Sequence, residues 1–451
     1  MVSEFVGGGY AKLGPPCQQI ASHTMPTLTE KILARAAGRK HVVPGEIVVI
    51  EPDVTLSHDN SAAIAQIFAQ LPHKRVKFPE RLAITLDHAV PPPSPKHARN
   101  HAEIREFARA QGIQQFYEVG RGICHQVLCE EGVVGPGMTL LGADSHSPHF
   151  GWLGAFSAGI GRSEVAALWA TGQLWLRVPE TLRINLTGSL RRGVTSKDLT
   201  LALIGGLGAD GAAYMAVEFA GEGLAKMTPD SRAALTNMMA EMGAKSACMP
   251  PDDTTWRWLR DTLARTRPQD YEQRLDYFEA NALYPVADAQ VAGEQTVDLC
   301  QVEPMVACPH AVDNSFPLSE VAGRRVDIGF IGTCTNGRLE DIAAAADLVS
   351  GRQLRRRLLV IPASSLVLRD AAEAGHITAL LDAGAVIGTP GCGPCMGNHM
   401  GVLAPGEVCI SSANRNFRGR MGEPAAEIYL ANPAVVAASC IAGKLTHPAD
   451  L

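Results

Sequence analysis

Three cysteines form the clearest chemical pattern in this sequence. Cys392 and Cys395 make up the motif C-G-P-C, and Cys334 lies 58 positions before Cys392. Glycines flank both segments, and glycine lets a backbone pass close to a bulky ligand. Such thiols occur in redox pairs, in Cys₃His zinc sites with His399 as the fourth ligand here, and in iron–sulfur clusters with one iron open to substrate. The spacing alone leaves all three alternatives open.

Histidines and acidic residues follow three predicted strands. Asp87 and His88 come after RLAITL, His125 comes after QQFYEVG, and an Asp-Ser-His segment at 144–146 comes after MTLLGA. A carboxylate beside an imidazole orients the ring and tunes its pKa, which suits proton transfer. Each group alone is also typical of a turn or a helix cap. Their shared position at strand ends favours a proton-transfer site.

An arginine-rich loop follows another predicted strand near the C-terminus. The segment SSANRNFRGRMG, residues 411–422, contains Arg415, Arg418 and Arg420. The planar guanidinium group binds carboxylates through two parallel hydrogen bonds, so this loop could hold an acidic substrate. A solvated basic turn is the alternative. The position after a strand and after the third cysteine favours carboxylate binding.

The elements that would carry these groups alternate between strand and helix. Residues 25–190 and the segment from 321 onward read as short apolar strands followed by helical patterns, whereas residues 191–320 are richer in helix. This alternation predicts an α/β fold of mainly parallel, doubly wound sheets. Ligands of such sheets bind beyond the carboxyl ends of the strands, which is where the cysteines, histidines and arginines lie.

Three local expectations are more specific. Residues 25–38 read as a helix capped by Thr27 or Thr29. Residues 235–244 read as a helix that places Asn237 and Glu241 on one face, because they are four positions apart. A helix that begins after Cys334 would bring its positive end to that thiolate and lower its pKa.

The same pattern suggests how the chain is divided. We expect a loose N-terminal arm at 1–24, followed by three α/β units at 25–200, 201–320 and 321–451. The cysteines belong to the last of these units. The active site is expected between the units.

Composition excludes several classes of protein. The 451 residues are 46% hydrophobic and carry a formal net charge of -6, which is typical of a globular protein and argues against binding to nucleic acid through a basic face. The sequence contains neither a long apolar run nor a secretory leader, so we expect a cytoplasmic protein that does not span a membrane. Eleven scattered cysteines argue for a reducing compartment rather than a disulfide framework.

Taken together, these segments resemble the aconitase superfamily, in particular the large subunits of 3-isopropylmalate dehydratase and homoaconitase. The resemblance runs from about residue 26 to the C-terminus and keeps the family order. The matching segments are DHAV at 87–90, GICHQV at 122–127, GADSHS at 142–147, LTNMMAEMGA at 235–244, IGTCTNGRLED at 331–341, GCGPC at 391–395 and SANRNFRGRMG at 412–422.

The resemblance implies a fold, a cofactor and a set of site residues. The fold is a three-domain aconitase-like core, and the cofactor is one [4Fe-4S] cluster whose fourth iron lacks a protein ligand and binds a 2-hydroxy di- or tricarboxylic acid. The implied cluster ligands are Cys334, Cys392 and Cys395. The implied catalytic residues are Asp87, His88, His125, Asp144, His146 and Glu241. The implied substrate-binding residues are Ser145, Asn237, Asn414, Arg415 and Arg420.

The resemblance also implies a partner and a reaction. The mobile fourth domain of the family, which carries a serine base and another arginine, has no counterpart that we recognise in this sequence. We therefore expect a separate small subunit that forms a heterodimer with this chain. The expected activity is that of a hydro-lyase, most like 3-isopropylmalate dehydratase of leucine biosynthesis, in which the 2-isomer becomes the 3-isomer through an alkene.

The substrate is the least specified part of this prediction. The segment SPHFGWLGAF at 147–156 replaces the Thr-rich stretch that is more usual in the leucine branch, and it adds His149, Phe150 and Trp152 near the expected pocket. Homoaconitase, dimethylmalate dehydratase and maleate or citraconate hydratase large subunits are therefore alternatives. A zinc-stabilised binding protein without catalytic activity, and RNA binding by a cluster-free form, are alternatives of other classes.

Overall fold

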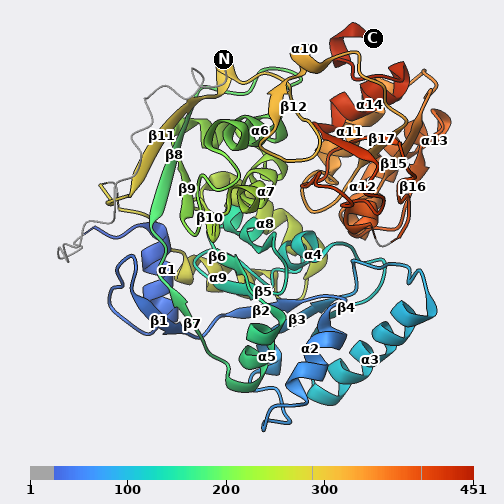
Figure 1. The fold of residues 1–451 in the computed structure, drawn as a ribbon. Helices are drawn as coiled ribbons and strands as arrows, with labels where there is room; N and C mark the ends of the chain where they lie inside the picture. The colour runs from blue at the N-terminus through green and yellow to red at the C-terminus, as the bar shows by residue number, and fades with distance from the viewer. Residues whose placement is uncertain (1–24, 287, 398) are drawn as a thin grey trace.

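A computed structural model describes residues 25–286, 288–397 and 399–451 (Figure 1). The expected N-terminal arm at 1–24 lies outside the described residues. The described chain forms three larger sheets and one two-stranded ribbon. In Figure 1 the blue and cyan N-terminal part lies below, the green and yellow middle part lies above it, and the orange and red C-terminal part packs beside the middle part.

The N-terminal sheet is wholly parallel, with strand order β4-β3-β2-β5-β6. Strand β2 lies in the middle of the sheet. It pairs with β3 on one side and with β5 on the other, so the strand order changes direction at β2. This is a topological switch point, where parallel sheets place their binding crevice. The elements of this part are β2 Val54–Ser57, α2 Ser61–Phe68, β3 Leu82–Thr85, α3 Pro95–Gln111, β4 Gln115–Tyr117, α4 Cys124–Glu130, β5 Thr139–Gly142, β6 Phe156–Gly159 and α5 Arg162–Thr171.

The middle sheet is also parallel, with strand order β10-β9-β8-β11. Helix α7 and the 3₁₀ turn that follows it belong to this part and carry Asn237 and Glu241. The elements are β8 Thr181–Thr187, α6 Ser196–Leu207, β9 Ala216–Ala220, α7 Pro229–Met238, the turn Met239–Met242, β10 Ser246–Cys248, α8 Asp253–Thr266, α9 Tyr271–Asn281 and β11 Gly293–Asp298.

The C-terminal sheet is mixed, with strand order β13-β12-β18-β17-β14-β15-β16. Its β14 to β18 strands pair in parallel, and β12 pairs antiparallel with both neighbours. The elements are β12 Met305–Ala307, β13 Ser315–Pro317, α10 Leu318–Val321, β14 Ile328–Ile331, α11 Leu339–Val349, β15 Arg357–Val360, α12 Ser365–Glu373, α13 His376–Asp382, β16 Val386–Ile387, β17 Val408–Ser411, β18 Glu427–Leu430 and α14 Pro433–Ala442.

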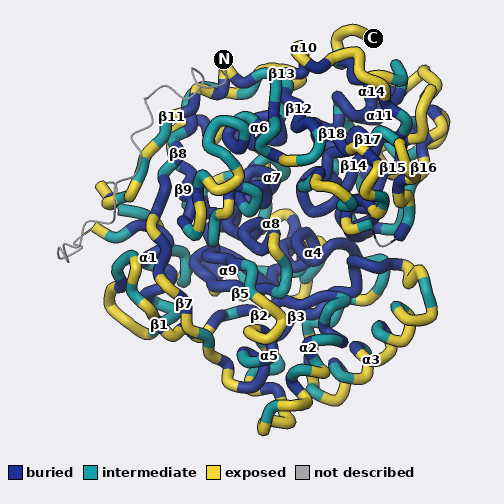
Figure 2. Tube along the Cα trace, in the orientation of Figure 1, coloured by how far each residue is buried: buried dark blue, intermediate teal, exposed yellow. Residues whose placement is uncertain are grey.

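Local sequence explains these elements well. The N-terminal helix α1, Leu28–Ala36, begins with a capping box in which Thr27 and Glu30 satisfy each other's backbone N–H groups, as expected for residues 25–38. The strands β2, β3, β5 and β14 are buried at every position because helices cover both faces of their sheets (Figure 2). The predicted α/β fold with mainly parallel sheets is therefore confirmed.

The sheet to which each strand belongs indicates where the domain boundaries lie. The division at 200/201 and 320/321 stays a proposal, but β8 joins the middle sheet, and β12 and β13 join the C-terminal sheet. Sheet membership thus favours earlier boundaries, one between β7 (Leu174–Arg177) and β8 and one between β11 and β12. Strand β7 pairs with β1, Ile47–Ile50, in the separate ribbon. No helix in the described part of the chain is long and apolar enough to cross a lipid bilayer.

The N-termini of α7 and α11 meet between the middle and C-terminal parts. Glu340, in the first turn of α11, accepts hydrogen bonds from the Thr228 hydroxyl at 2.6 Å and the Ser231 hydroxyl at 3.1 Å. The Glu340 backbone N–H in turn faces Asp230 at 3.4 Å. Burial, followed by the charges of Asp230 and Asp341, raises the pKa of Glu340 to about 8.

This raised pKa predicts how stability depends on pH. The folded chain keeps the Glu340 proton up to about pH 8, whereas the unfolded chain releases it near pH 4.5, so this contribution to stability is complete below pH 4.5 and is lost as pH rises through 8. We expect Glu340→Gln to be more resistant to urea than wild type at pH 8.5, by on the order of 1 kcal/mol because the neutral amide has no proton to lose, and equal to it near pH 4.5. Equal urea midpoints at pH 8.5 would contradict this. Glu106→Gln, at an exposed glutamate of α3, is the matched control.

Candidate functional site

Asp59 holds the loop that follows β3. Its carboxylate accepts hydrogen bonds from the backbone N–H groups of Asp87 at 2.9 Å, His88 at 2.7 Å and Ala89 at 3.2 Å, and it bonds to His101 Nε2 at 2.6 Å. A carboxylate with this many donors is fixed in place, and it fixes the loop in turn. The Asp87 and His88 side chains are thereby directed into the crevice beyond the strand ends.

Three histidine–carboxylate pairs converge in that crevice. His88 Nδ1 lies 2.6 Å from Asp87 Oδ1, and His125 Nε2 lies 3.0 Å from Asp144 Oδ1. His146 Nε2 lies 2.8 Å from Glu241 Oε1. Asp144 links the first two pairs, because its Oδ2 is 3.4 Å from His88 Nε2. The six residues expected to act in proton transfer are thus brought together.

The charges of these pairs differ. Burial alone would lower the pKa of His88, but Asp87 and Asp144 hold it well above its usual value, so His88 carries a proton at neutral pH. Burial and then the Arg415 charge lower the pKa of His146. Burial alone would raise the pKa of Asp144, yet His125 and His88 hold it well below its usual value. The site therefore contains a protonated imidazole beside an ionised carboxylate.

The three cysteines border the same crevice and are buried. Asn414 lies between them, since its Nδ2 donates to Cys334 Sγ at 3.6 Å and its Oδ1 is 3.9 Å from Cys395 Sγ. The same Nδ2 donates to Asn237 Oδ1 at 2.5 Å. A hydrogen bond from the Cys392 thiol and the nearby Arg420 guanidinium hold the pKa of Cys395 well below its usual value.

The cysteine loop and the histidine loop touch. The Cys392 backbone N–H donates to the Asp87 carbonyl at 2.8 Å. A Cβ atom at Gly391 would lie 2.6 Å from that same carbonyl oxygen, so only glycine fits without movement. The segment 391–395 therefore rests directly on the segment that carries Asp87 and His88.

The arrangement of the thiols fits an iron–sulfur cluster better than zinc. Tetrahedral zinc with Zn–S bonds of about 2.3 Å would bring the sulfurs within about 3.8 Å of one another. Among the described residues, the one group of three or more His, Cys, Asp or Glu side chains whose ligand atoms all lie within 4.8 Å contains no cysteine. The expected alternative ligand, His399, instead bonds to the His88 carbonyl through Nε2 at 3.0 Å. Cys392 and Cys395 lie within hydrogen-bond reach of each other, so Cys334 is the thiol that stands farther away, and His399 does not complete a Cys₃His set.

That compact group consists of His58, Asp59, Asp87 and His88. Asp59 and His88 bond to neighbouring side chains and backbone N–H groups as described above, whereas the buried Nδ1 of His58 has no hydrogen-bond partner among the described residues. Asp59 and Asp87 therefore act at least as positioning residues for the loop and for His88.

A cavity of about 360 Å³ joins the thiols to the histidines. Arg415 and Arg420 both line it; the first donates to Glu241 Oε1 at 2.7 Å and the second to Cys395 Sγ at 3.2 Å. Arg418 is exposed and lies outside it. The cavity also takes in Ser145, His146, Asn414 and all three cysteines.

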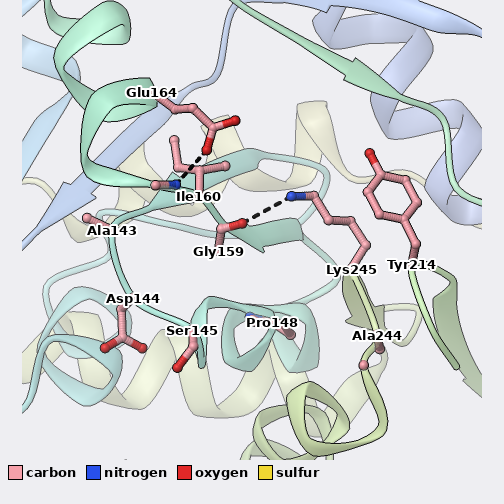
Figure 3. Close-up of a pocket in the computed structure, with 12 residues that line it drawn as sticks. Ala143, Asp144, Ser145, Pro148, Gly159, Ile160, Glu164, Tyr214, Ala244 and Lys245 are labelled. Carbon is pink, nitrogen blue, oxygen red and sulfur yellow. Dashed lines mark hydrogen bonds between the residues drawn. The ribbon is translucent and has the colours of Figure 1, made fainter. Parts of the chain in front are cut away.

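A second cavity of about 410 Å³ shares a wall with the first, formed by residues 143–145 and 160–161 (Figure 3). Lys245 reaches across it to the Gly159 carbonyl at 3.0 Å, with the Tyr214 ring beside it. Glu164 lies on the opposite side and accepts from the Gly161 N–H at 2.5 Å. The two cavities thus have Asp144 and Ser145 as common lining residues, whereas Lys245 lines only the second.

Two local expectations need correction. Helix α7 ends at Met238, so Glu241 lies in the following 3₁₀ turn rather than on the same helix as Asn237; Gly243 in the left-handed region closes this turn. The helix after Cys334 does form, but α11 begins only at Leu339. Burial raises the pKa of Cys334 to about 12 instead of a helix end lowering it.

Sequence reasoning missed His58 and Asp59, which follow β2 directly. His58 stacks on His88 with ring centroids 3.8 Å apart. Asn60 is oriented by two backbone contacts, its Oδ1 accepting from the His58 N–H and its Nδ2 donating to the Ala143 carbonyl. The same Nδ2 lies 2.8 Å from His58 Nε2, so this nitrogen accepts and Nδ1 carries the proton. The signal was available, because SHDN at 57–60 ends a strand just as the other clusters do.

The family model and the similar curated proteins each match most of the chain. The model of the aconitase family (aconitate hydratase) matches residues 30–443. The probable 3-isopropylmalate dehydratase large subunit of Methanothermobacter thermautotrophicus is 46% identical over 428 residues, which cover 94% of this chain and 99% of that protein. The homoaconitase large subunit of Thermus thermophilus is 47% identical over 430 residues, covering 94% and 98%. The crystal structure of aconitase X from Thermococcus kodakaraensis superposes with a TM-score of 0.46 at 13% identity, covering 86% of this chain and 89% of that one.

Proposed function

The chain belongs to the aconitase family, and on that basis we propose that it is the large subunit of an iron–sulfur hydro-lyase, either an isopropylmalate dehydratase or a homoaconitase. The finer proposal is the conversion of 2-isopropylmalate to 3-isopropylmalate through the alkene. The observation that carries the proposal is the meeting of three thiols, three histidine–carboxylate pairs and two arginines around one cavity.

Family membership implies a [4Fe-4S] cluster. We propose Cys334, Cys392 and Cys395 as its ligands, with one iron left without a protein ligand, since His399 is bonded elsewhere. When bound, the cluster would supply a Lewis-acidic iron that polarises the C–O bond of the leaving hydroxyl group. Asn414 and Arg420 would donate hydrogen bonds to the sulfurs, as they do here to Cys334 and Cys395.

The histidine pairs would handle the proton that a departing hydroxide needs. His88 is the best proton donor, because Asp87 and Asp144 keep its imidazole charged. Asp144 orients both His88 and His125, and it also accepts the His146 backbone N–H at 2.7 Å. In the reverse direction the same groups would take the proton from water.

The arginines would hold the substrate carboxylates. Arg415 and Arg420 both line the cavity, the first bonded to Glu241 and the second to Cys395. Two fixed carboxylates would align the C–H and C–OH bonds for elimination. Ser145 and Asn414 would add hydrogen bonds from the wall of the cavity, and Asn237, which does not line it, would orient Asn414. A separate small subunit would complete the site with the base that removes the carbon-bound proton.

One experiment tests this function. The chain is loaded with iron and sulfide without oxygen, mixed with a candidate small subunit, and assayed for alkene formation from isopropylmalate, homocitrate, dimethylmalate, and from hydration of maleate or citraconate. Turnover of a 2-hydroxy acid that needs both subunits is the expected result. Full turnover by the isolated chain would contradict the split site. Tightly bound zinc with no acid-labile sulfide would contradict the hydro-lyase and favour a zinc-stabilised binding protein.

A further inference from the structure

Lys197 is a charged side chain that the reaction described above does not use. It lies in the first turn of α6 and is among the largest fully buried side chains of the described chain, with no exposed surface. It is not part of the wall of either cavity. Its ammonium group is therefore enclosed by protein and does not face the space in which a substrate would bind.

The contacts of this ammonium group are few and neutral. Nζ donates to the Ala413 carbonyl at 2.6 Å and approaches Met238 Sδ at 3.6 Å. Within the described residues it forms no ion pair with a carboxylate. An enclosed cation without a counter-charge costs several kcal/mol, so a buried lysine in this position calls for an anion nearby.

The two nearest acidic side chains are already occupied. Asp198 accepts from the Met305 and Thr195 backbone N–H groups and from Asn432. Glu241 is shared by His146 and Arg415. Neither forms an ion pair with the Lys197 ammonium group, although both charges partly oppose the lowering of its pKa by burial.

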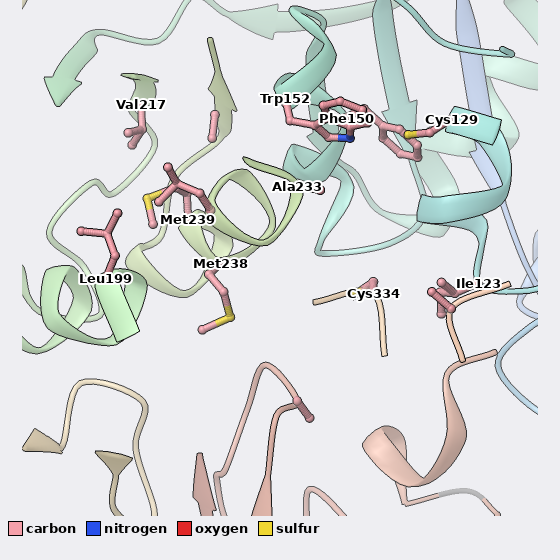
Figure 4. Close-up of a cluster of buried hydrophobic side chains, with 14 of the residues drawn as sticks. Ile123, Cys129, Phe150, Trp152, Leu199, Val217, Ala233, Met238, Met239 and Cys334 are labelled. Carbon is pink, nitrogen blue, oxygen red and sulfur yellow. The ribbon is translucent and has the colours of Figure 1, made fainter. Parts of the chain in front are cut away.

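The carbonyl that binds Lys197 leads directly to the thiols. Ala413 precedes Asn414, whose side chain contacts Cys334 Sγ at 3.6 Å and Cys395 Sγ at 3.9 Å. Met238, the other contact, belongs to the same apolar core as Cys334 (Figure 4). Lys197 is thus bonded to the residue before Asn414, whose side chain contacts two of the three thiols, and it does not line the cavity.

We propose that Lys197 is the buried counter-charge of the iron–sulfur cluster, acting across the Ala413–Asn414 peptide from outside the cavity in which a substrate would bind. This inference rests on the proposed function. A [4Fe-4S]²⁺ core with three thiolates carries a net charge of about -1, which one ammonium group offsets. Removing a nearby positive charge disfavours the more negative, reduced cluster, so the midpoint potential falls. The positive charge of Lys197 would also slow the loss of iron from a cluster that is bound by only three protein ligands.

Lys197→Met tests this, because methionine has a similar length and no charge. With the cluster loaded, we expect the variant to release iron to a ferrous chelator at least about tenfold faster than wild type and to show a more negative midpoint potential. After the iron is removed, we expect its thermal unfolding to match wild type or to occur at higher temperature, because an unpaired buried ammonium has been replaced by an apolar group. Lys197→Arg, which keeps the charge, should restore the potential.

The outcomes separate this inference from the proposed function. Unchanged chelation rate and potential in Lys197→Met would overturn it, and so would a loss of stability that is equally large with and without iron, which indicates a purely structural lysine. Lys245→Met removes another largely enclosed lysine that is bonded to a carbonyl, and it should leave the chelation rate at the wild-type value. If the wild-type chain itself holds no cluster, the proposed function fails instead.

Discussion

A Cys392→Ser variant is expected to lose the cluster and, with it, at least about 10³-fold of the hydro-lyase activity of the assembled enzyme. Serine keeps the size of the side chain, but its hydroxyl is not ionised at neutral pH and is a poor ligand for iron in place of a thiolate. Iron and sulfide content after anaerobic loading, together with the visible absorbance, measures the effect.

Cys440→Ser provides the matched control for this variant. Cys440 is equally buried, but it lies in α14 and its Sγ contacts the Arg357 carbonyl at 3.7 Å, away from the cavity. The control should load normally. A fully loaded, normally coloured Cys392→Ser chain would remove Cys392 from the ligand set.

Asp144→Asn is expected to lower kcat of the assembled enzyme by about 10²–10⁴-fold while the cluster still loads. The neutral amide cannot hold the His88 proton or orient His125, because it offers one acceptor and one donor where two imidazoles need acceptors. The loss should appear in kcat more than in KM, since Asp144 acts on the proton rather than on the substrate carboxylates. Steady-state kinetics with the small subunit present, at matched iron content, gives the measurement.

Asp347→Asn is a suitable companion, since Asp347 is an exposed carboxylate of α11. It should leave kcat at the wild-type value. A normal kcat of Asp144→Asn at full cluster content would show that the linked histidine pairs do not transfer the proton. It would also contradict the role of His88 as the proton donor.

The sequence predicted the alternation of elements and most of the residues around the cavity for a physical reason. Chemistry at the carboxyl ends of parallel strands appears in the sequence as polar residues directly after apolar runs, and Asp87 and Asp144 follow that rule after β3 and β5. His125 does not, because it lies in α4, eight positions after the end of β4. The pairing of each histidine with its carboxylate was harder to foresee. His146 and Glu241 meet at 2.8 Å although 95 positions separate them, so only the packing of two sheets decides that contact.

Other features could not be foreseen from local pattern. The end of α7 before Glu241 depends on a 3₁₀ turn that periodicity does not reveal. The high pKa of Cys334 comes from burial, which is a property of the whole fold. Asp59 reads as an ordinary turn residue, and its role emerges only when three backbone N–H groups and His101 are seen to converge on it.

The contact of Gly391 and Cys392 with the Asp87 carbonyl has a consequence for damage and repair. Any displacement of the segment 391–395 would have to break this bond or carry Asp87 with it. The proposed cluster ligands and the proposed proton donor are thus tied by one contact. Damage that moves the cysteine segment would therefore also disturb proton transfer, and repair would have to restore both.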